Sequence, residues 1–342
     1  MQPDFSLLKE LSEALGPSGF EDAVRLIIKK KLEKLGFKSA EDGLGNLYVR
    51  LGEGRPLTLI AAHMDEIGFI VKYITSNGFL RVASLGGVNP GIMPGTSVAI
   101  LGEKGVVKGV FGTIPPHLIK REDGQREVRV EDLYVDIGAS SREEVEASGI
   151  KLGTALTFDA DFWDLGKAVS GKAFDDRLGC FALLEALRTA EPPSKGSVII
   201  AFTVQEEVGT RGASVLAHRF SPDYGISVEG TIASDVPGVS EENWVTALGR
   251  GPAVRVFDAT IVASRQLVDY VLNVAESAGI PVQIQLSPHS GTDAGRFVLL
   301  GARPGNISIP ARYIHSPRAL SLKSDIEYAV KIIREIIERP PP

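Results

Sequence analysis

The chain has 342 residues, more than a typical single domain, and it is 44% hydrophobic and 23% charged, as an ordinary soluble globular protein is. Its net charge is −6, and no segment concentrates Lys and Arg without acids nearby, which argues against nucleic acid or an anionic membrane as the main partner. Its apolar runs are too short to span a membrane.

The N-terminal quarter predicts two helices and then two strands. Residues 5–15 and roughly 21–35 carry apolar side chains three and four positions apart, which is the helical spacing. Gly16-Pro17 ends the first helix and Gly36 ends the second. "NLYVRL" and "PLTLIAAH" predict two strands, and the second is apolar enough to be buried on both faces.

Between about Lys72 and Asp161, short β-like runs alternate with Gly and Pro, and only "SREEVEASG" has a helical pattern. This spacing predicts a small β-rich unit, either a barrel or a sandwich. After about residue 164, strands and helices alternate, which favours a largely parallel sheet covered by helices. The predicted helices are 176–190, 210–218, 264–278, 292–300 and 321–338, and the predicted strands are 197–204, 224–229, 252–257, 282–286 and 305–309.

The expected fold class is therefore α/β, with a mixed, mostly parallel sheet flanked by helices and a small inserted β-barrel-like domain. The α/β domain is discontinuous and comprises residues 1–71 and 164–342. The inserted domain comprises residues 72–163.

Acids and histidines follow several of the predicted strands. In open α/β sheets, ligands bind beyond the carboxyl ends of the strands, so these side chains are expected to converge. Two histidines and several carboxylates at one sheet edge are the ligand set of a divalent metal site. The residues are His63 and Asp65 in "LTLIAAHMDE", Glu206 and Glu207 in "VIIAFTVQEE", Glu229 in "YGISVEG", His315 in "GNISIPARYIH", and Asp175 and Asp176 in "GKAFDDRLG".

Each of these motifs alone has a structural explanation. His63 could be a hydrogen-bonded core histidine, although an Asp two residues later also suits a metal ligand that a carboxylate orients. Either Asp of "FDDR" could cap a helix, and Glu206 and Glu207 could be a capping acid beside a solvated one. Coincidence at five separate strand or helix ends is the weaker explanation, so one shared site is favoured.

"SPHSGTDAGRF" predicts a loop that lines a substrate pocket, with His289, Thr292 and Asp293 as its binding residues. Its glycines would allow close approach of the backbone. The alternative is a loop that caps the helix at 292–300 through Thr292 or Asp293. The other histidines, His117 and His218, are interpreted as structural or solvated.

The single cysteine, Cys180, excludes an internal disulfide and is expected to be a packed core thiol. One thiol and an N-terminus without a signal-type apolar run favour the cytoplasm. The chain has six Asn and six Gln against 20 Pro, which indicates a thermophilic source.

Taken together and in this order, "AAHMDEIGF", "GKAFDDRLG", "VQEEVGTRGA", "VEGTIASDVPG", "SGTDAGRF" and "IPARYIHSP" resemble the M42 family of metallo-aminopeptidases, the self-assembling TET type. The similarity covers essentially the whole chain, including the β insertion. It implies a zinc-peptidase-like α/β domain and two divalent ions per subunit, Zn²⁺ or Co²⁺.

The resemblance also implies a role for each motif residue. His63 binds one metal, Asp175 bridges both, and Asp176 occupies a position that does not ligate. Glu207 and His315 bind the second metal. The remaining ligand of the first metal is usually an aspartate; Glu229 falls at that place, and Asp235 is the alternative.

The implied reaction is hydrolysis of N-terminal residues, neutral or aliphatic ones, from short peptides. Glu206 is the general base that takes a proton from a metal-bridging water, and Asp65 fixes the ring of His63. The inserted domain is expected to mediate dimerisation, and dimers to build a homododecamer with inward-facing sites.

Three other functions remain open at this stage. A related two-metal carboxypeptidase or N-acyl deacylase could share the α/β core. A glycoside hydrolase, such as a glucanase, would use Glu206 and Glu207 as acid and base, but its carboxylates must flank the bond at roughly 5 to 9.5 Å. A non-enzymatic module could hold the metal structurally.

Overall fold

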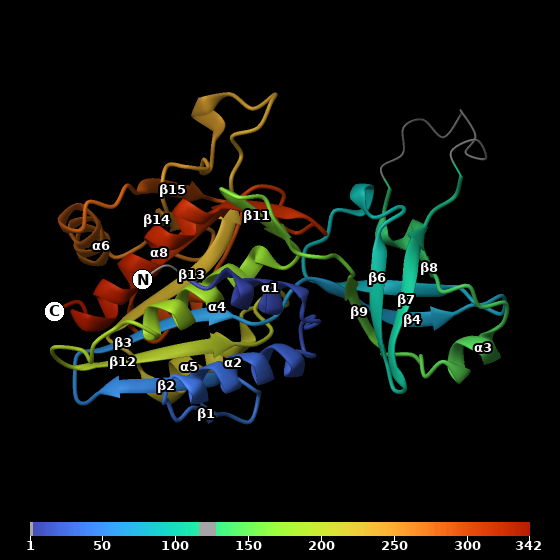
Figure 1. Ribbon diagram of the computed structural model, residues 1–342, viewed down its shortest axis with the longest axis horizontal. Coiled ribbons are helices and arrows are strands. Elements are labelled where there is room, and N and C mark those ends of the chain that lie inside the picture. The colour runs from blue at the N-terminus through green and yellow to red at the C-terminus, as the bar shows by residue number, and fades with distance from the viewer. Residues whose placement is uncertain (1–2, 116–127) are drawn as a thin grey trace.

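The computed structural model describes residues 3–115 and 128–342, so His117 lies outside the described residues. The chain forms two bodies that lie side by side, an α/β unit and a smaller β-barrel (Figure 1). The barrel is inserted between the third and the twelfth strands of the chain, so the α/β unit is built from both ends of the sequence.

An eight-stranded sheet forms the centre of the α/β unit, in the order β1-β2-β12-β3-β13-β16-β14-β15. β3 and β12 are buried along their whole length, as expected for strands covered on both faces. The strands are Ala40–Glu41 (β1), Leu47–Gly52 (β2), Leu57–His63 (β3), Ser197–Thr203 (β12), Tyr224–Ile232 (β13), Ala253–Asp258 (β14), Gln283–Ser287 (β15) and Arg303–Ala311 (β16).

The sheet is mixed and mostly parallel, as predicted. β12, β3, β13 and β16 run parallel to their neighbours in this series, whereas β2 is antiparallel to β12 and β14 is antiparallel to β16. The carboxyl ends of these four strands therefore meet at one edge of the sheet. His63, Glu206, Glu229 and His315 lie in or just after these strands, so the topology brings them to the same edge.

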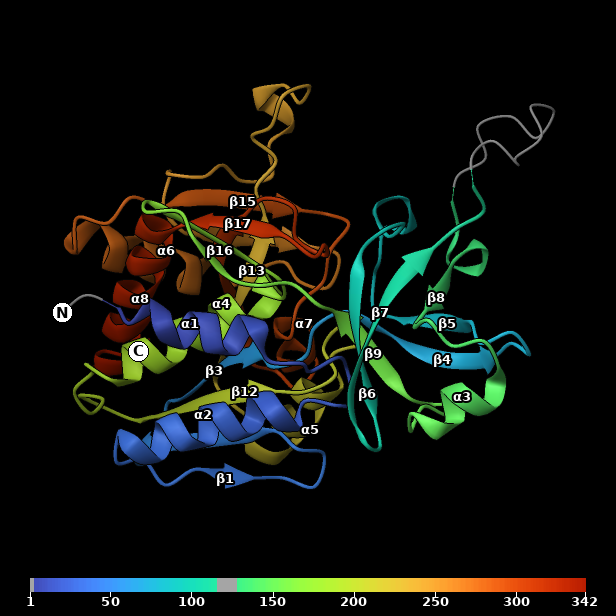
Figure 2. The same cartoon turned by 45° about the vertical axis from the view of Figure 1, so that its right-hand side comes forward.

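Helices cover both faces of the sheet, and the two faces have separate cores. One face packs against α1, α2, α4, α6 and α8, and the other against α5 and α7 (Figure 2). The helices are Phe5–Glu13 (α1), Asp22–Lys34 (α2), Phe174–Leu187 (α4), Arg211–Phe220 (α5), Arg265–Ser277 (α6), Ala294–Val298 (α7) and Lys323–Glu338 (α8).

The predicted helix 292–300 is shorter in the structure, because only Ala294–Val298 is helical. The side chains that precede it serve in tertiary hydrogen bonds instead. Thr292 accepts from Ser227 at 3.2 Å, and Asp293 accepts from Thr203 at 2.6 Å. Asp293 therefore does not cap the helix through its side chain.

The insertion is a closed six-stranded barrel, in the order β4-β5-β8-β7-β6-β9, which resolves the choice between barrel and sandwich. Its core is aromatic and aliphatic, with Phe69 packed against both Phe111 and Phe158. Its elements are Gly68–Ile74 (β4), Leu80–Leu85 (β5), Pro90–Ile92 (η1), Ser97–Gly102 (β6), Gly105–Gly112 (β7), Val130–Asp132 (η4), Tyr134–Asp136 (β8), Arg142–Ala147 (α3) and Ala155–Phe158 (β9).

A small sheet that the sequence did not predict joins distant parts of the chain. β10 (Trp163–Asp164), β11 (Ala168–Gly171) and β17 (Ala319–Leu322) pair in that order, all antiparallel. These strands are only two to four residues long, too short for a periodic pattern. A short helical turn, η5 (Glu241–Asn243), lies on an arm that projects from the α/β unit (Figure 1).

Among the described residues, no helix is both long and apolar enough to cross a bilayer. Cys180 is buried in α4 with its thiol 3.1 Å from the main-chain oxygen of His63, so it is the packed core thiol that the sequence predicted.

Candidate active site

The carboxylate of Asp65 organises the site from behind. It accepts hydrogen bonds from the backbone N–H of Glu206 at 2.9 Å and of Glu207 at 3.1 Å, and from the hydroxyl of Ser18 at 2.6 Å. Asp65 follows β3 and the two glutamates follow β12, and these strands are parallel neighbours. Asp65 thus fixes the backbone from which both glutamate side chains project.

His63 ends β3 and is held at both ring nitrogens. Nδ1 lies 3.1 Å from the main-chain oxygen of Asp65 and 3.5 Å from its carboxylate, and Nε2 lies 3.2 Å from Oδ1 of Asp175. Burial lowers the pKa of His63, but the hydrogen bonds to Asp175 and Asp65 more than offset it, so the pKa lies well above its usual value. The Nδ1 contact leaves Nε2 directed at the acidic cluster.

Asp175 and Asp176 are neighbours with different surroundings. Both have non-helical backbone angles at the start of α4, and the peptide bond between them is cis. The carboxylate of Asp176 is directed inward, where it accepts from the backbone N–H groups of Gly179, Gly230 and His63 at 2.9 to 3.1 Å. Only Asp175 is left to face the site.

Asp175 lies between the two histidines. Its Oδ1 is 3.2 Å from Nε2 of His63, and its Oδ2 is 3.1 Å from Nε2 of His315. Burial alone would raise the pKa of Asp175. The hydrogen bonds from His315 and His63 lower that pKa by more than burial raises it, so it lies below its ordinary value. This is the placement that a carboxylate shared by two cations requires.

His315 is positioned by the barrel as well as by the α/β unit. It lies in the loop after β16 at a φ of 57°, and its Nδ1 contacts the main-chain oxygen of Gly87 at 2.8 Å. Its Nε2 is 3.3 Å from Oε1 of Glu207. The neighbouring Gly86 has a φ of +87°, and a Cβ there would lie 3.1 Å from Oε2 of Glu207.

The remaining acids of the site are buried and crowded. Burial raises the pKa of Glu207 to about 7, of Glu229 to about 8 and of Asp293 to about 6. Burial, together with the nearby charges of Glu229, Asp293 and Glu207, also raises the pKa of Glu206 well above its usual value. Glu229 accepts from the backbone N–H of Asp293 at 3.2 Å.

These features fit divalent cations. One donor atom from each of His63, Asp175 and Glu207 lies within 4.8 Å of the other two. Two buried carboxylate oxygens, Oε1 of Glu207 and Oδ1 of Asp293, accept no hydrogen bond from any residue that the structure describes. Crowded buried acids of this kind are costly unless positive charge is supplied, and nitrogen and oxygen donors are those that Zn²⁺ and Co²⁺ accept.

Asp235, the alternative to Glu229, is engaged elsewhere. Its carboxylate accepts two hydrogen bonds from Arg312, of 2.6 and 3.0 Å. Burial would raise the pKa of Asp235, but the contact with Arg312 lowers it by more, so the net pKa is lowered. Glu229, in contrast, lies close enough to His63 and Asp175 for their charges to affect its pKa. Glu229 is therefore the better placed of the two.

The residues of the predicted pocket loop differ in exposure. His289 is exposed, whereas Thr292 and Asp293 are buried, and the backbone N–H of Asp293 donates to Glu229. His218 is exposed on α5 and bonds to the main-chain oxygen of Ser214 at 2.8 Å, as expected for a solvated histidine.

Sequence reasoning missed the supports of the site. Ser18 and Gly87 have no local motif that predicts their contacts. A buried ion pair behind the site was also missed: Nζ of Lys172 lies 2.6 and 2.8 Å from the carboxylate oxygens of Glu66, which also accepts from Thr157 of the barrel at 3.0 Å. The adjacency of Glu66 to Asp65 was the only signal for it.

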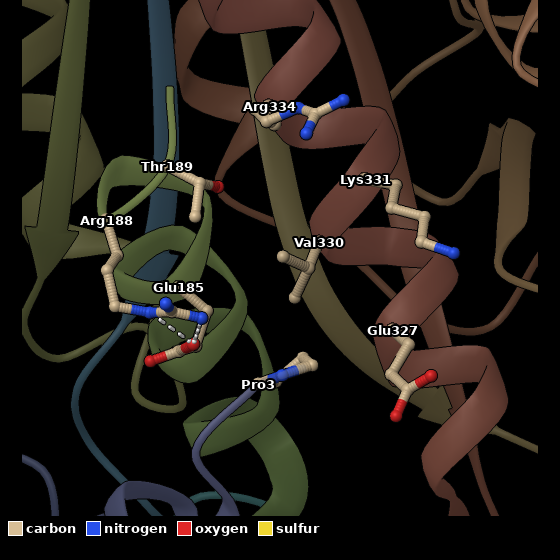
Figure 3. A pocket seen from close by; sticks show the side chains of 8 residues that line it. All are labelled: Pro3, Glu185, Arg188, Thr189, Glu327, Val330, Lys331 and Arg334. Atoms are coloured by element: carbon tan, nitrogen blue, oxygen red, sulfur yellow. Dashed lines mark hydrogen bonds and ion pairs between the residues drawn. The ribbon is translucent and has the colours of Figure 1, made fainter. Parts of the chain in front are cut away.

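A separate hollow lies at the opposite end of α4, of about 370 Å³ (Figure 3). Glu185 lies near the C-terminal end of α4, whereas Asp175 lies at its start. Glu185 is bound by Arg188 in the hollow, and the described residues of its lining include no histidine. It is lined by Pro3, Glu185, Arg188, Thr189, Glu327, Val330, Lys331 and Arg334.

The fold and this cluster are those of a metal-dependent aminopeptidase. The chain matches the family described as M42 glutamyl aminopeptidase over residues 45–332, and it belongs to that family. It is 34% identical to the lysyl aminopeptidase of Pyrococcus furiosus over 99% of this chain and 98% of the relative.

The chain is also similar to solved structures of TET peptidases. The TET aminopeptidase of a marine sediment Thaumarchaeota archaeon is 38% identical, with a TM-score of 0.94 over 98% of this chain and 96% of that one. The TET1 peptidase of Pyrococcus horikoshii, which assembles into a tetrahedron or a large octahedral shell, is 35% identical, with a TM-score of 0.88 over 98% and 99%. A Thermotoga maritima protein named as an endoglucanase is 34% identical, with a TM-score of 0.80 over 97% and 96%.

Proposed function

We propose that the protein is a two-metal aminopeptidase that removes neutral or aliphatic N-terminal residues from short peptides. The observation that supports this most strongly is the row formed by His63, Asp175 and His315, with Glu207 beside it. Such a row can hold two cations through one shared carboxylate, and a second glutamate remains for proton transfer.

His63, Asp175 and Glu229 would hold one ion, and Asp175, Glu207 and His315 the other. When bound, the ions, Zn²⁺ or Co²⁺, would polarise the scissile carbonyl and make a water molecule more acidic. The second-ion ligands come from a strand end, a helix start and a loop braced by the barrel. Asp65 orients His63 through its main-chain oxygen and carboxylate.

Glu206 is the proposed general base. Its carboxylate accepts no hydrogen bond from the described residues, so it is free to take a proton from the attacking water and pass it to the leaving amine. Burial and the nearby charges of Glu229 and Asp293 raise its pKa, which makes its carboxylate a stronger base than a solvated glutamate. Because Asp65 fixes its backbone, Glu206 needs no other positioning contact.

The substrate's α-ammonium group is proposed to bind at the acid-rich end of the site. Glu206, Glu229 and Asp293 concentrate negative charge there, which would favour a free N-terminus over a blocked one. His289, Thr292 and Asp293 remain the proposed substrate-pocket residues, with Asp293 acting through its contact with Glu229.

The inserted domain, residues 72–163, is proposed to mediate dimerisation, and the α/β domain, residues 1–71 and 164–342, to carry catalysis. The tetrahedral assembly of the Pyrococcus horikoshii relative, together with a similar TET1 structure that is named as a dodecamer, supports a homododecamer with enclosed sites. We also propose a cytoplasmic location, because the one cysteine is a buried free thiol, and a thermophilic source, because the chain has few Asn and Gln side chains.

Two alternatives have a specific feature in their favour. A carboxypeptidase or N-acyl deacylase could use the same two-metal cluster, but it would not need the acids that would bind a free amine. A glucanase is suggested by the name of the Thermotoga maritima protein. Glycosidase carboxylates need no histidines between them, so the His63–Asp175–His315 row disfavours it.

Metal titration of chelated protein tests the proposal. Activity on leucine p-nitroanilide should be lost on chelation and return with Zn²⁺ or Co²⁺, saturating near two ions per subunit by elemental analysis. Hydrolysis of a β-glucan that persists after chelation would instead support the glucanase.

A further inference from the structure

The barrel contributes a wall to the active site. Gly87 follows β5, and its main-chain oxygen contacts Nδ1 of His315 at 2.8 Å. From that contact, an open groove of about 640 Å³ runs along the junction between the barrel and the α/β unit. One wall is barrel loop and the other is the loop after β16; the groove is lined by Gly87, Val88, Asn89, Ile92, Tyr313, Ile314, His315, Ser316 and Pro317.

The groove differs in chemistry from the rest of the site. Apart from His315, its lining in the described part of the chain contains no Asp, Glu, Lys or Arg. Each wall also presents a large apolar or aromatic side chain to solvent: Ile92 is 41% exposed and Tyr313 is 57% exposed. Exposed apolar side chains that line the same groove mark a binding surface.

The position of the groove decides which part of a peptide would reach it. His63, Asp175, His315 and Gly87 contact one another in that order. Glu229, which binds the backbone of Asp293, lies near enough to His63 and Asp175 for their charges to affect its pKa. A free α-ammonium group is attracted to the acidic end of this series. The chain that follows the scissile bond must then leave at the His315 end, where the groove begins.

The loop that carries Tyr313 and His315 has an unusual backbone. Both residues have positive φ, 61° and 57°, which costs free energy for residues other than glycine. The hydrogen bond to Gly87 and the contact with Asp175 hold this conformation. The loop is therefore held in one conformation, and it offers a bound residue a contact surface of fixed shape.

We propose that this groove receives the side chain of the residue after the scissile bond, and that it selects an apolar or aromatic residue there. The inference rests on the proposed aminopeptidase function. On this proposal, the barrel helps to select the substrate in addition to its proposed role in assembly. Ile92 and Tyr313 are the residues that determine this selectivity.

Dipeptide amides test this directly. With X the N-terminal residue that the wild-type enzyme cleaves fastest, X-Phe-NH₂, X-Leu-NH₂, X-Asp-NH₂ and X-Lys-NH₂ are compared with X-NH₂, which leaves only ammonia and does not fill the groove. We expect kcat/KM to be about tenfold higher with Phe or Leu than with Asp or Lys after the bond.

Replacement of Ile92 should change that preference. Ile92→Asp should lower the X-Phe-NH₂ to X-NH₂ ratio of kcat/KM about tenfold and favour Lys, and Ile92→Ala should lower it less. Val106→Asp is the matched control, since Val106 is 52% exposed on β7 of the same barrel and does not line the groove. Its ratio should equal that of the wild type.

The outcomes separate this inference from the proposed function. If X-NH₂ is hydrolysed but the residue after the bond has no effect, or if Ile92→Asp leaves the ratio unchanged, the groove assignment is wrong. If wild-type protein with metal hydrolyses none of the substrates, the proposed function is wrong and the groove assignment falls with it.

Discussion

Glu206→Gln and Glu207→Gln should fail in different ways, although the two residues are neighbours. Glu207 lies 3.3 Å from His315 and belongs to the cluster that could hold a metal ion. Glu206 accepts no hydrogen bond from the described residues, so an isosteric amide removes only its charge. Glu206→Gln is therefore expected to lose rate and keep metal, and Glu207→Gln to lose metal.

The magnitudes follow from these surroundings. A general base contributes about 10²- to 10⁴-fold, so Glu206→Gln should raise the activation free energy by about 3 to 5.5 kcal/mol. The same change removes a buried charge beside Glu229 and Asp293, so the melting temperature of metal-free protein should hold or rise. Glu207→Gln removes a charged ligand, so bound metal should fall towards one ion per subunit.

The assay combines kcat on a leucine substrate with elemental analysis of metal per subunit and a melting curve, for each variant and for Glu33→Gln. Glu33 is exposed on α2, so its variant controls for loss of a carboxylate elsewhere. Substantial activity in Glu206→Gln, or loss of metal from it equal to the loss in Glu207→Gln, would refute the division of roles.

Three further predictions concern stability and positioning. Between pH 6 and 9 the melting temperature of chelated protein should fall, because burial raises the pKa of Glu207 from 4.5 to about 7, and carboxylate contacts raise that of His315 from 6.5 to about 9 despite its burial. Both groups favour the folded state when protonated, and that contribution is lost as pH rises. Glu66→Gln should destabilise the protein by about 3 to 5 kcal/mol, measured by denaturant melts, since it leaves Lys172 as an unpaired buried charge. Gly86→Ala should weaken metal binding, because its Cβ would lie 3.1 Å from Glu207 in addition to the cost of a positive φ.

Each of these predictions has its own control. For the pH prediction, the melting temperature of metal-loaded protein should fall less than that of chelated protein over the same pH range. A melting temperature of chelated protein that stays constant or rises with pH would contradict the prediction. Glu103→Gln, in an exposed pair with Lys151, should leave the melts unchanged, and an equal effect of the two variants would contradict the second. Gly95→Ala has the same φ cost at +84° but meets no atom within 4 Å, so equal metal affinity in Gly86→Ala and Gly95→Ala would contradict the third.

Much of the fold could be predicted because its signals are local. β3 and β12 are continuous apolar runs, and the helices of the α/β unit carry apolar side chains at helical spacing. The polar residues at the strand ends could be gathered into one site because parallel strands share a carboxyl edge. The ordered motifs then identified the family, which the match over residues 45–332 confirmed.

The contacts that support the site could not be predicted, because they join residues far apart in the sequence. His315 meets Gly87 across 228 positions, and Glu66 meets Lys172 across 106. Nothing near Gly87 indicated that its main-chain oxygen would orient a histidine. The resemblance to the M42 family therefore suggested an insertion for assembly alone, whereas the structure places a main-chain oxygen of the barrel against His315, a proposed metal ligand.

The most direct test of the central claim is a mass-spectrometric time course on one hexapeptide, supplied with a free and with an acetylated N-terminus, using metal-loaded and chelated protein. We predict stepwise loss of N-terminal residues from the free peptide by metal-loaded protein alone, with the acetylated peptide intact. Equal cleavage of the acetylated peptide, release from the C-terminus, or cleavage that survives chelation would contradict the account.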